Sequence, residues 1–280
     1  MSGEPRTHVT FVAPLEMFQT DVEQISIGEE VVLREAKSED KQLLAEMVKS
    51  GLVTQHALPK FGFALETTLL SPERTIDMCE ASERFARAVT ALRLLKSGAF
   101  GLPLLLAFQT ESRALRSALF PFRPRIAGQR YSLEGQDAAQ LNRISQSLSV
   151  VPPSHRYSMA LRRFEMAYER WLAEDRLIDY WVALEALFLP DGPPQELRYR
   201  ASLRVAWFVA QGPGEREEIF RQIRDSYDAR SGIVHGRNPK DVPSISQFTE
   251  DVLRRALRKA VATPGSLDPQ QLDSLIVRGS

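Results

Sequence analysis

The chain has 280 residues, 43% of them apolar and 26% charged, with a formal net charge of zero. This balance is typical of a globular protein and excludes both a disordered chain and one with the basic field of a duplex-DNA binder. Cys79 is the single cysteine, the longest apolar stretch (residues 98–108) is too short to span a bilayer, and residues 1–11 lack a signal core, so we expect a cytoplasmic chain without disulfides or membrane contact.

The first 150 residues predict a mixed α and β domain with an acidic N-terminal end. Alternating apolar residues predict strands over residues 7–18 and 24–36, with Gly28 at a turn in the second stretch. Ser38 as an N-cap, followed by acidic residues and by Gly51 beyond the last turn, predicts a short helix. The remaining predictions here are strands at 61–70, 102–112 and 117–122, an amphipathic helix from Glu80 to Leu95, and a helix over 132–148.

Two consecutive prolines, Pro152 and Pro153, predict a domain boundary near residues 151–154, because they cannot continue a helix. Helices separated by Gly/Pro turns are predicted beyond it, over residues 156–174, 176–190, 196–210, 215–234 and 245–262. The predicted fold class is therefore α+β. A mixed α/β domain would occupy residues 1–150, an all-α bundle 151–265, and a C-terminal tail 266–280.

Arg230 is the residue that this pattern leaves unexplained. It lies about 20° from Ile219 on the helical wheel of residues 215–234, within a predicted apolar stripe formed by Ile219, Phe220, Ile223 and Tyr227. A buried guanidinium needs a partner, because an unpaired charge in a core costs several kcal/mol. Glu185, on the edge of the apolar face of the 176–190 helix, is the nearby acid so placed, whereas Asp179 projects to the opposite side. Helix phase alone leaves two partners open, this carboxylate or a bound phosphate.

His235 follows Arg230 by five residues and lies near the helix end. We expect Gly232 to loosen the helix and the residues from Gly236 onward to end it. On a continuous helix the five-residue step sets Arg230 and His235 about 140° apart. The two side chains could then share a pocket only if the helix breaks at Gly232 or if a second subunit completes the site.

Three stretches in this order, RLIDYWVALEALF, ELRYRASLRVAWFVA and YDARSGIVHG, resemble the HEPN superfamily and specifically its Apea-like branch. That family carries an R-x4-H-type motif near a helix end, which is similar to Arg230, Ser231, Val234, His235 and Gly236 here. An upstream "ALE" helix resembles Ala183, Leu184 and Glu185. The resemblance covers residues 155–262, and the ISIGEEVVLREAKSED region resembles only loosely the part that precedes such domains.

The resemblance implies a metal-independent endoribonuclease without a cofactor, acting as a homodimer and as a toxin or anti-phage defence effector. It implies His235 as the general acid or base, Arg230 as the ligand of the phosphate and transition state, and Glu185 as the residue that orients one of them. RNA contacts would come from Ser231, Asn238, Arg237 and Tyr227. The substrate would be RNA, with tRNA one candidate, and residues 1–150 would sense a trigger or bind a regulatory partner.

The main alternative is a non-catalytic dimerisation or nucleotide/RNA-binding module that keeps Arg230 for structure. Most other chemistry-bearing residues have plain interpretations. Histidines His8 and His56 lack chemical neighbours in sequence, and His155 opens a helix as a cap or surface residue. Arginines in the second half are mostly expected in solvated ion pairs. The aromatic residues at helical spacing predict a core or a dimer interface: Phe164, Tyr168, Trp171, Tyr180, Trp181, Trp207 and Phe208.

Overall fold

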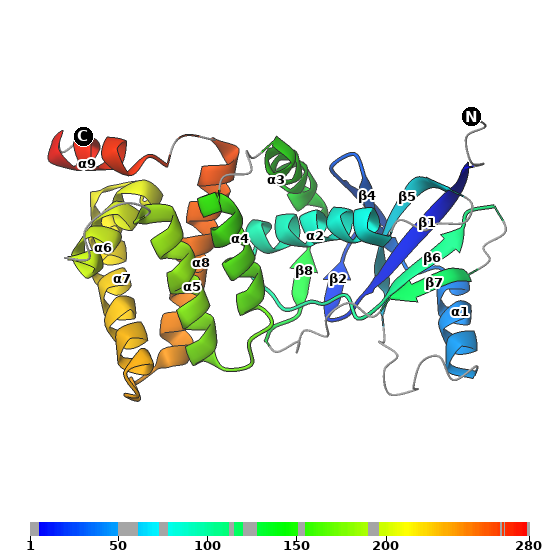
Figure 1. The fold of residues 1–280 in the computed structure, drawn as a ribbon, viewed down its shortest axis with the longest axis horizontal. Helices are drawn as coiled ribbons and strands as arrows, with labels where there is room; N and C mark the ends of the chain where they lie inside the picture. Colours follow the sequence, from blue (N-terminus) through cyan, green and yellow to red (C-terminus); the bar gives the residue numbers. More distant parts are fainter. Residues whose placement is uncertain are drawn as a thin grey trace. The chain divides into compact units, whose positions relative to one another are not determined.

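The computed structural model describes residues 6–49, 61–72, 78–111, 115–119, 128–150, 155–189, 196–263, 265 and 267–278. The chain divides into two compact units, Met1–Gln146 and Ser147–Ser280, which are treated separately below (Figure 1). The boundary predicted at residues 151–154 lies outside the described residues. Within these ranges, no helix is both long enough and apolar enough to cross a membrane. The α+β fold class predicted from the sequence is confirmed.

The N-terminal unit is built on an antiparallel sheet of six described strands in the order β3-β4-β5-β1-β6-β7. Their bounds are β1 Arg6–Leu15, β3 Gln24–Ile27, β4 Val31–Glu35, β5 Phe63–Pro72, β6 Leu105–Gln109 and β7 Leu115–Leu119. Two short strands, β2 (Phe18–Thr20) and β8 (Tyr131–Leu133), pair in parallel beside it. Gly28 adopts a left-handed φ of 66° in the β3–β4 turn, which confirms the turn predicted there.

Helices of the N-terminal unit are α1 (Ser38–Lys49), α2 (Met78–Leu95) and α3 (Ala138–Val150). The buried face of α2, including Phe85 and Leu92, packs toward β4 and β5. The helix predicted over 132–148 starts later than expected, at Ala138. The reason is that Tyr131 and Leu133 are fully buried in β8, and the Tyr131 hydroxyl donates to the Leu92 carbonyl at 2.7 Å.

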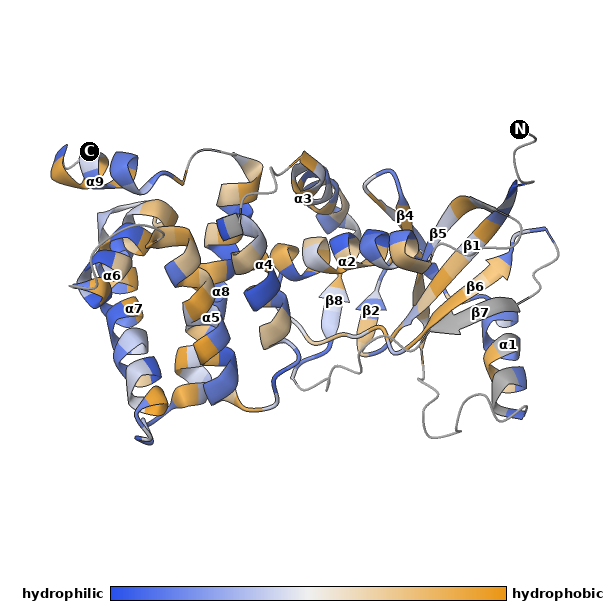
Figure 2. Cartoon of the chain, in the orientation of Figure 1, coloured by the Kyte–Doolittle hydropathy of each residue, from blue (hydrophilic) through white to orange (hydrophobic). Residues whose placement is uncertain are grey.

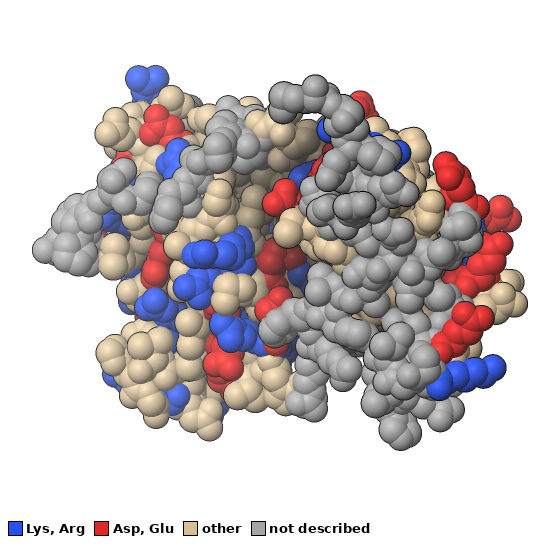
Figure 3. Space-filling model, turned by 45° about the vertical axis from the view of Figure 1, so that its right-hand side comes forward, with Lys and Arg blue, Asp and Glu red and all other residues tan. Residues whose placement is uncertain are grey.

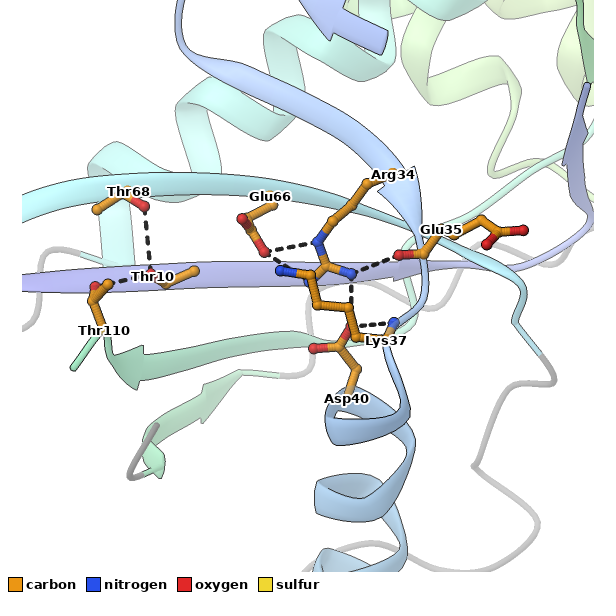
Figure 4. A network of polar contacts seen from close by, with 8 residues as sticks. All are labelled: Thr10, Arg34, Glu35, Lys37, Asp40, Glu66, Thr68 and Thr110. Atoms are coloured by element: carbon orange, nitrogen blue, oxygen red, sulfur yellow. Dashed lines mark hydrogen bonds and ion pairs between the residues drawn. The ribbon is translucent and has the colours of Figure 1, made fainter. Parts of the chain in front are cut away.

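A buried arginine fixes α1 against this sheet (Figure 4). Arg34 of β4 is 5% exposed and donates from Nε to Glu66 of β5 at 2.8 Å and from Nη1 to Asp40 of α1 at 2.7 Å. The same Nη1 also donates to the Glu35 carbonyl. Asp40 in turn accepts from the Lys37 amide at 2.9 Å, so one carboxylate holds both the helix start and the arginine. Buried charges paired in this way avoid the cost of an isolated ion.

The C-terminal unit is a helical bundle in which α5 occupies the centre. Its helices are α4 His155–Ala167, α5 Ala173–Phe188, α6 Leu197–Val209, α7 Pro213–Val234, α8 Val242–Ala262 and α9 Pro269–Arg278. Helix α5 packs against α4, α6, α7 and α8, and Trp181, Leu184 and Phe188 are fully buried. Figure 2 shows apolar residues along α5 and along strand β6 of the other unit.

The helix predicted over residues 156–174 is interrupted, since α4 ends at Ala167 and α5 starts at Ala173. The intervening turn brings Arg170 back to Asp179 of α5 at 2.7 Å, where Arg163 of α4 also binds at 2.9 Å. Asp179 is only 3% exposed. Helix α5 is therefore also covered on the side opposite its apolar stripe. The buried Asp179, with its two arginine partners, connects α5 to α4 and to the turn that follows α4.

Residues predicted as a C-terminal tail contain α9, which packs against α6. Leu267, just before α9, and Leu272, within it, are both buried. Arg204 of α6, 4% exposed, forms a two-pronged pair with Asp273 at 2.8 and 2.6 Å. Its remaining Nη1 donates to the carbonyl of Phe188 at 2.6 Å. One buried guanidinium thus joins α6 to the C-terminal end of α5 and to the middle of α9.

Candidate functional site

Helix α7 carries the predicted motif, and its buried face differs from the predicted stripe. The buried residues are Ile219, Ile223, Ser226, Ala229 and Gly232, whereas Phe220 and Tyr227 are half-buried. Three of the five buried residues are small, which lets neighbouring helices approach the C-terminal half of α7 closely. The burial therefore centres on a different side of the helix, and the prediction that placed Phe220 and Tyr227 inside the core was wrong.

A chain of buried polar contacts sets the position of α7 in the bundle. Trp181 of α5 donates from Nε1 to the Ser226 hydroxyl at 2.8 Å, and this hydroxyl lies 2.7 Å from that of Thr249 in α8. The Tyr227 ring meets the Trp181 ring edge-on, with centroids 5.1 Å apart. Buried polar groups of this kind are costly unless paired, so these contacts fix which side of α7 faces α5 and α8. A serine at an otherwise apolar position was the sequence signal for this contact.

Arg230 lies at the edge of the buried face of α7. Its side chain is 23% exposed, and its Nη2 lies 3.5 Å from the Glu185 carboxylate, which is 29% exposed. Its buried Nε has no hydrogen-bond partner among the described residues. Burial raises the pKa of Glu185 above its usual value, and the attraction of Arg230 offsets this only in part. The two side chains meet as helix phase predicted, but in a loose and partly exposed pair.

His235 is the C-cap of α7 and is exposed. The helix continues unbroken through Gly232 to Val234, so of the two alternatives left open by the sequence, the one that needs a break at Gly232 does not occur. Gly236 takes the left-handed conformation with φ 73°, its amide donates to Ile233 O at 3.0 Å, and the Arg237 amide donates to Gly232 O at 2.8 Å. This bond pattern is a Schellman motif. A glycine directly after the histidine was the sequence signal for it.

Gly232 has a packing role instead of a hinge role. It is buried, and a Cβ at this position would lie 3.2 Å from Cγ of Pro239 and 3.7 Å from Cβ of Arg237. The chain beyond the helix end therefore folds back close to α7. This return places the exposed Arg237 and Asn238 near the end of the helix that carries Arg230 and His235.

The structure brings together only part of the predicted site. Glu185 pairs with Arg230, Tyr227 packs on Trp181, and Ser231 is half-buried next to Arg230. His235 makes no side-chain hydrogen bond or ion pair with any described residue. Because α7 is continuous, the separation of about 140° between Arg230 and His235 persists. The two side chains of one copy therefore leave the helix in different directions.

An ion pair beside the motif was not anticipated from the sequence. Arg198, in the first turn of α6, binds Asp228 of α7 at 2.5 Å, and both side chains are about half exposed. Asp228 lies two residues before Arg230. The pair engages the acid nearest in sequence to Arg230, and the ion pair of Arg230 among the described residues is with Glu185.

Several arginines of the helical unit form ion pairs with acids, in line with the general expectation for its helix faces. Arg255 binds Glu215 at 2.5 Å, and the buried Arg254 binds Glu250, which also accepts from the Tyr168 hydroxyl. Figure 3 shows Lys and Arg atoms lying next to Asp and Glu atoms on one face of the molecule. Among the described residues, no group of three His, Cys, Asp or Glu side chains could hold a metal ion.

The other histidines stay outside this arrangement. His8 is an exposed residue of β1 in the N-terminal unit, and His155 opens α4. His56 and Gly51 lie outside the described residues.

Comparison of the chain with protein-family models, curated proteins and solved structures finds no match. The chemical interpretation of the site therefore depends on its own geometry.

Proposed function

We propose that the helical unit is a metal-independent endoribonuclease of the HEPN type. The observation that supports this most directly is the state of the Arg230 guanidinium, which is held at the rim of α7 by one 3.5 Å contact to Glu185. Its buried Nε has no hydrogen-bond partner among the described residues. A guanidinium held so loosely by a carboxylate can exchange it for phosphate oxygens, which its planar fork binds with two hydrogen bonds.

The reaction follows from the residue types. The 2′-hydroxyl oxygen of RNA attacks the neighbouring phosphorus, an imidazole accepts its proton, and the bond from phosphorus to the 5′-oxygen breaks. The leaving 5′-oxygen takes up a proton, so that the products are a 2′,3′-cyclic phosphate and a 5′-hydroxyl. The His235 imidazole would exchange these protons, and Arg230 would stabilise the charge that develops on the phosphoryl oxygens. DNA lacks the nucleophile and would not be cut.

A second copy of the chain would be part of the active enzyme under this proposal. Arg230 and His235 of one copy diverge on a continuous helix, and His235 is exposed. Exposed imidazoles of two copies facing one cleft would bring a histidine of one copy to the phosphate bound by an arginine. Glu185, whose pKa is raised by burial and lowered by Arg230, would hold Arg230 in place before RNA binds.

Incubation of the purified protein with total RNA or tRNA in the presence of EDTA tests the activity. We expect cleavage to products with 2′,3′-cyclic phosphate ends. His235→Ala should reduce the rate by about a hundredfold or more, as is usual for loss of a general acid or base. Because His235 is exposed, the Tm of the His235→Ala variant should remain within about 2 °C of the wild-type Tm. His8→Ala, in the other unit, is the matched control and should cleave normally.

The alternative is a non-catalytic dimerisation or RNA-binding module, which the Arg230–Glu185 pair within one chain favours. Arg230→Ala and His235→Ala separate the two functions. A structural role predicts that only the arginine variant changes, through lost stability. A catalytic role predicts that both variants lose cleavage while the histidine variant stays as stable as the wild type. Cleavage by His235→Ala at the wild-type rate would refute the enzyme proposal.

Use of this activity as a toxin or defence effector belongs to the same proposal, with the N-terminal unit as the part that receives a trigger or partner. Expression of the wild-type chain should then slow bacterial growth, and His235→Ala should relieve the effect at equal protein level. Growth inhibition by both chains alike would contradict a toxic role that depends on catalysis.

A further inference from the structure

Aromatic rings alternate with arginines on the outer side of the α6–α7 hairpin. Five residues form this line, which we call the hairpin stripe: Tyr199 and Trp207 from α6, and Arg216, Phe220 and Arg224 from α7. The Arg216 guanidinium lies 3.5 Å from the centre of the Trp207 ring. The Tyr199 and Phe220 rings meet edge-on at 5.7 Å, and the Arg224 guanidinium lies 5.9 Å from the Phe220 centroid.

The hairpin stripe is at the surface of the helical unit. Tyr199 is 52% exposed, Arg224 is exposed, and Trp207, Arg216 and Phe220 are half-buried. A tyrosine exposed to this extent contributes little to the core and offers surface to a ligand. Guanidinium groups stacked on rings present a positive, planar surface of the same kind.

The line continues along α7 toward the proposed catalytic residues. Phe220, Arg224, Tyr227 and Ser231 follow each other at steps of four, three and four residues, which places them on one side of the helix within about 60°. At 1.5 Å per residue this path covers about 16 Å. It ends at Ser231, which is next to Arg230. A polymer lying along the stripe would arrive at the guanidinium that is proposed to bind phosphate.

The chemistry of the stripe fits unpaired bases. Every base has a flat π-face that stacks on an aromatic ring or a guanidinium, and the arginines can also contact the backbone phosphates. A duplex hides these faces inside its own stack, so a stacking surface selects single strands. One acid near the stripe, Asp228, is paired with Arg198 at 2.5 Å and opposes an anionic polymer less than a free carboxylate would.

We infer that the hairpin stripe binds the bases of a single-stranded RNA segment and directs its backbone to Arg230. This inference rests on the proposed ribonuclease function, because it names the class of substrate for the same site. Tyr199 would stack on a base, while Arg224 would contact phosphate. Preference for single-stranded loops over duplex RNA is the resulting specificity.

The test uses the full-length protein and a short, fluorescent, 2′-O-methylated oligouridylate, which cannot be cleaved by 2′-hydroxyl attack. Affinity is measured by fluorescence anisotropy. Tyr199→Ala should weaken binding about fivefold or more, as expected for the loss of one stacked base, while Tyr199→Phe keeps the ring and the affinity. Arg224→Gln should lower the slope of log affinity against log salt by about 0.7. Trp171→Ala removes another exposed aromatic, 47% exposed at the α4–α5 turn, and should bind as the wild type does.

Three results would overturn the inference: wild-type affinity in Tyr199→Ala, equal affinity of the wild type for a duplex of the same sequence, or no binding of the single strand at all. A changed sedimentation coefficient of Tyr199→Ala with unchanged RNA affinity would identify the stripe as a protein interface and would also overturn it. Cleavage is judged separately, from cyclic-phosphate products and the His235→Ala variant. The stripe can therefore fail while the nuclease stands, and the nuclease can fail while the stripe binds RNA.

Discussion

The Arg230–Glu185 pair lies where two helices that run in the same direction approach their C-terminal ends. Trp181 contacts Ser226, and four residues later on each helix Glu185 meets Arg230. The N–O distance of 3.5 Å is longer than that of a good hydrogen bond. With about a quarter of each side chain exposed, such a pair contributes about 0–1 kcal/mol. It holds Arg230 in place without making it unavailable to a ligand.

Glu185 gives this pair a pH dependence whose sign is fixed by the direction of its pKa. The folded-state pKa is raised above the usual 4.5 because burial penalises the carboxylate more than Arg230 favours it. The contribution of Glu185 to the free energy of unfolding is therefore fully present below pH 4.5. It is lost as the pH rises through the folded-state pKa. Glu185→Gln removes the penalty. Thermal unfolding should show the variant more stable than the wild type at pH 7, by up to roughly 1 kcal/mol, and equal to it near pH 4.

Glu185→Asp is the control, because it keeps the charge with a shorter side chain. It should retain the loss of stability toward neutral pH. If Glu185→Gln were instead destabilised at pH 7, the attraction to Arg230 would outweigh the burial penalty, and the pair would have a structural role.

At the same scale, the sequence identified Glu185 as one of two possible partners of Arg230, because both positions follow from helix phase. It was not sufficient for the exposure of Arg230. That depends on Ser226, Ala229 and Gly232, whose small side chains allow close packing and so turn the buried face of α7. Single-helix periodicity weights large apolar residues such as Tyr227, and it carries no information on how closely a neighbouring helix approaches.

Among the helices, the end of α7 decides where His235 points. The left-handed Gly236, with φ 73°, ends the helix directly after the histidine. Gly236→Ala should destabilise the fold by about 1 kcal/mol, since a Cβ is unfavourable in this conformation. Chemical denaturation measures the change. Gly214→Ala, in the first turn of the same helix with no atom within 4 Å of the added Cβ, should be neutral or slightly stabilising.

A similar loss in both glycine variants would show that the left-handed conformation is not the cause. Cleavage by Gly236→Ala is a second measurement on the same protein. A helix that continues past Val234 would move His235, so the rate should fall by more than the small change in folded fraction explains.

A charge pair between Arg204 and Asp273 contributes to the docking of helix α9. The Arg204 guanidinium lowers the pKa of Asp273 below its usual 3.8, so this pair stabilises the docked helix above pH 3.8 and is lost as pH falls through the folded value. Asp273→Asn removes the charge but not the shape. We expect the free energy that docks α9 to fall by about 1–2 kcal/mol. This is less than a fully buried ion pair would contribute, because the Asp273 side chain is 54% exposed. Limited proteolysis followed by mass spectrometry should show faster cleavage between α8 and α9.

Ser274→Ala is the matched control, because Ser274 is an exposed neighbour on α9 that bonds only its own helix. It should be cut at the wild-type rate. Equal cleavage of all three proteins would show that burial of Leu267 and Leu272, and not the charge pair, holds α9.

Element predictions from periodicity succeeded where the apolar pattern was long, as in α2, α5, α7 and α8. They failed where a tertiary contact decided the boundary. The predicted 156–174 helix contains no glycine or proline, and its interruption depends on Asp179 drawing Arg163 and Arg170 to one buried acid. Nothing local to residues 168–172 signals a contact with an acid on the next helix.

For the whole molecule, the division into two compact units predicts that the helical unit is stable by itself. A chain cut to residues 151–280 keeps every helix from α4 to α9, the Arg204–Asp273 pair and the buried Trp181 contacts. It should show a helical circular dichroism spectrum and one cooperative urea transition. A fragment without a cooperative transition would show that the helical core needs the N-terminal unit. Cleavage by the folded fragment would place the activity in the bundle alone.

The distribution of tryptophan has a practical consequence for such measurements. Trp171, Trp181 and Trp207 are the three tryptophans of the chain, and all belong to the helical unit. Tryptophan emission, excited selectively, is therefore an optical probe of this unit without any added label, and the N-terminal unit contributes no tryptophan to it. Trp181 reports the core, and Trp207, stacked under Arg216 in the hairpin stripe, would be quenched by a nucleobase that approaches this surface.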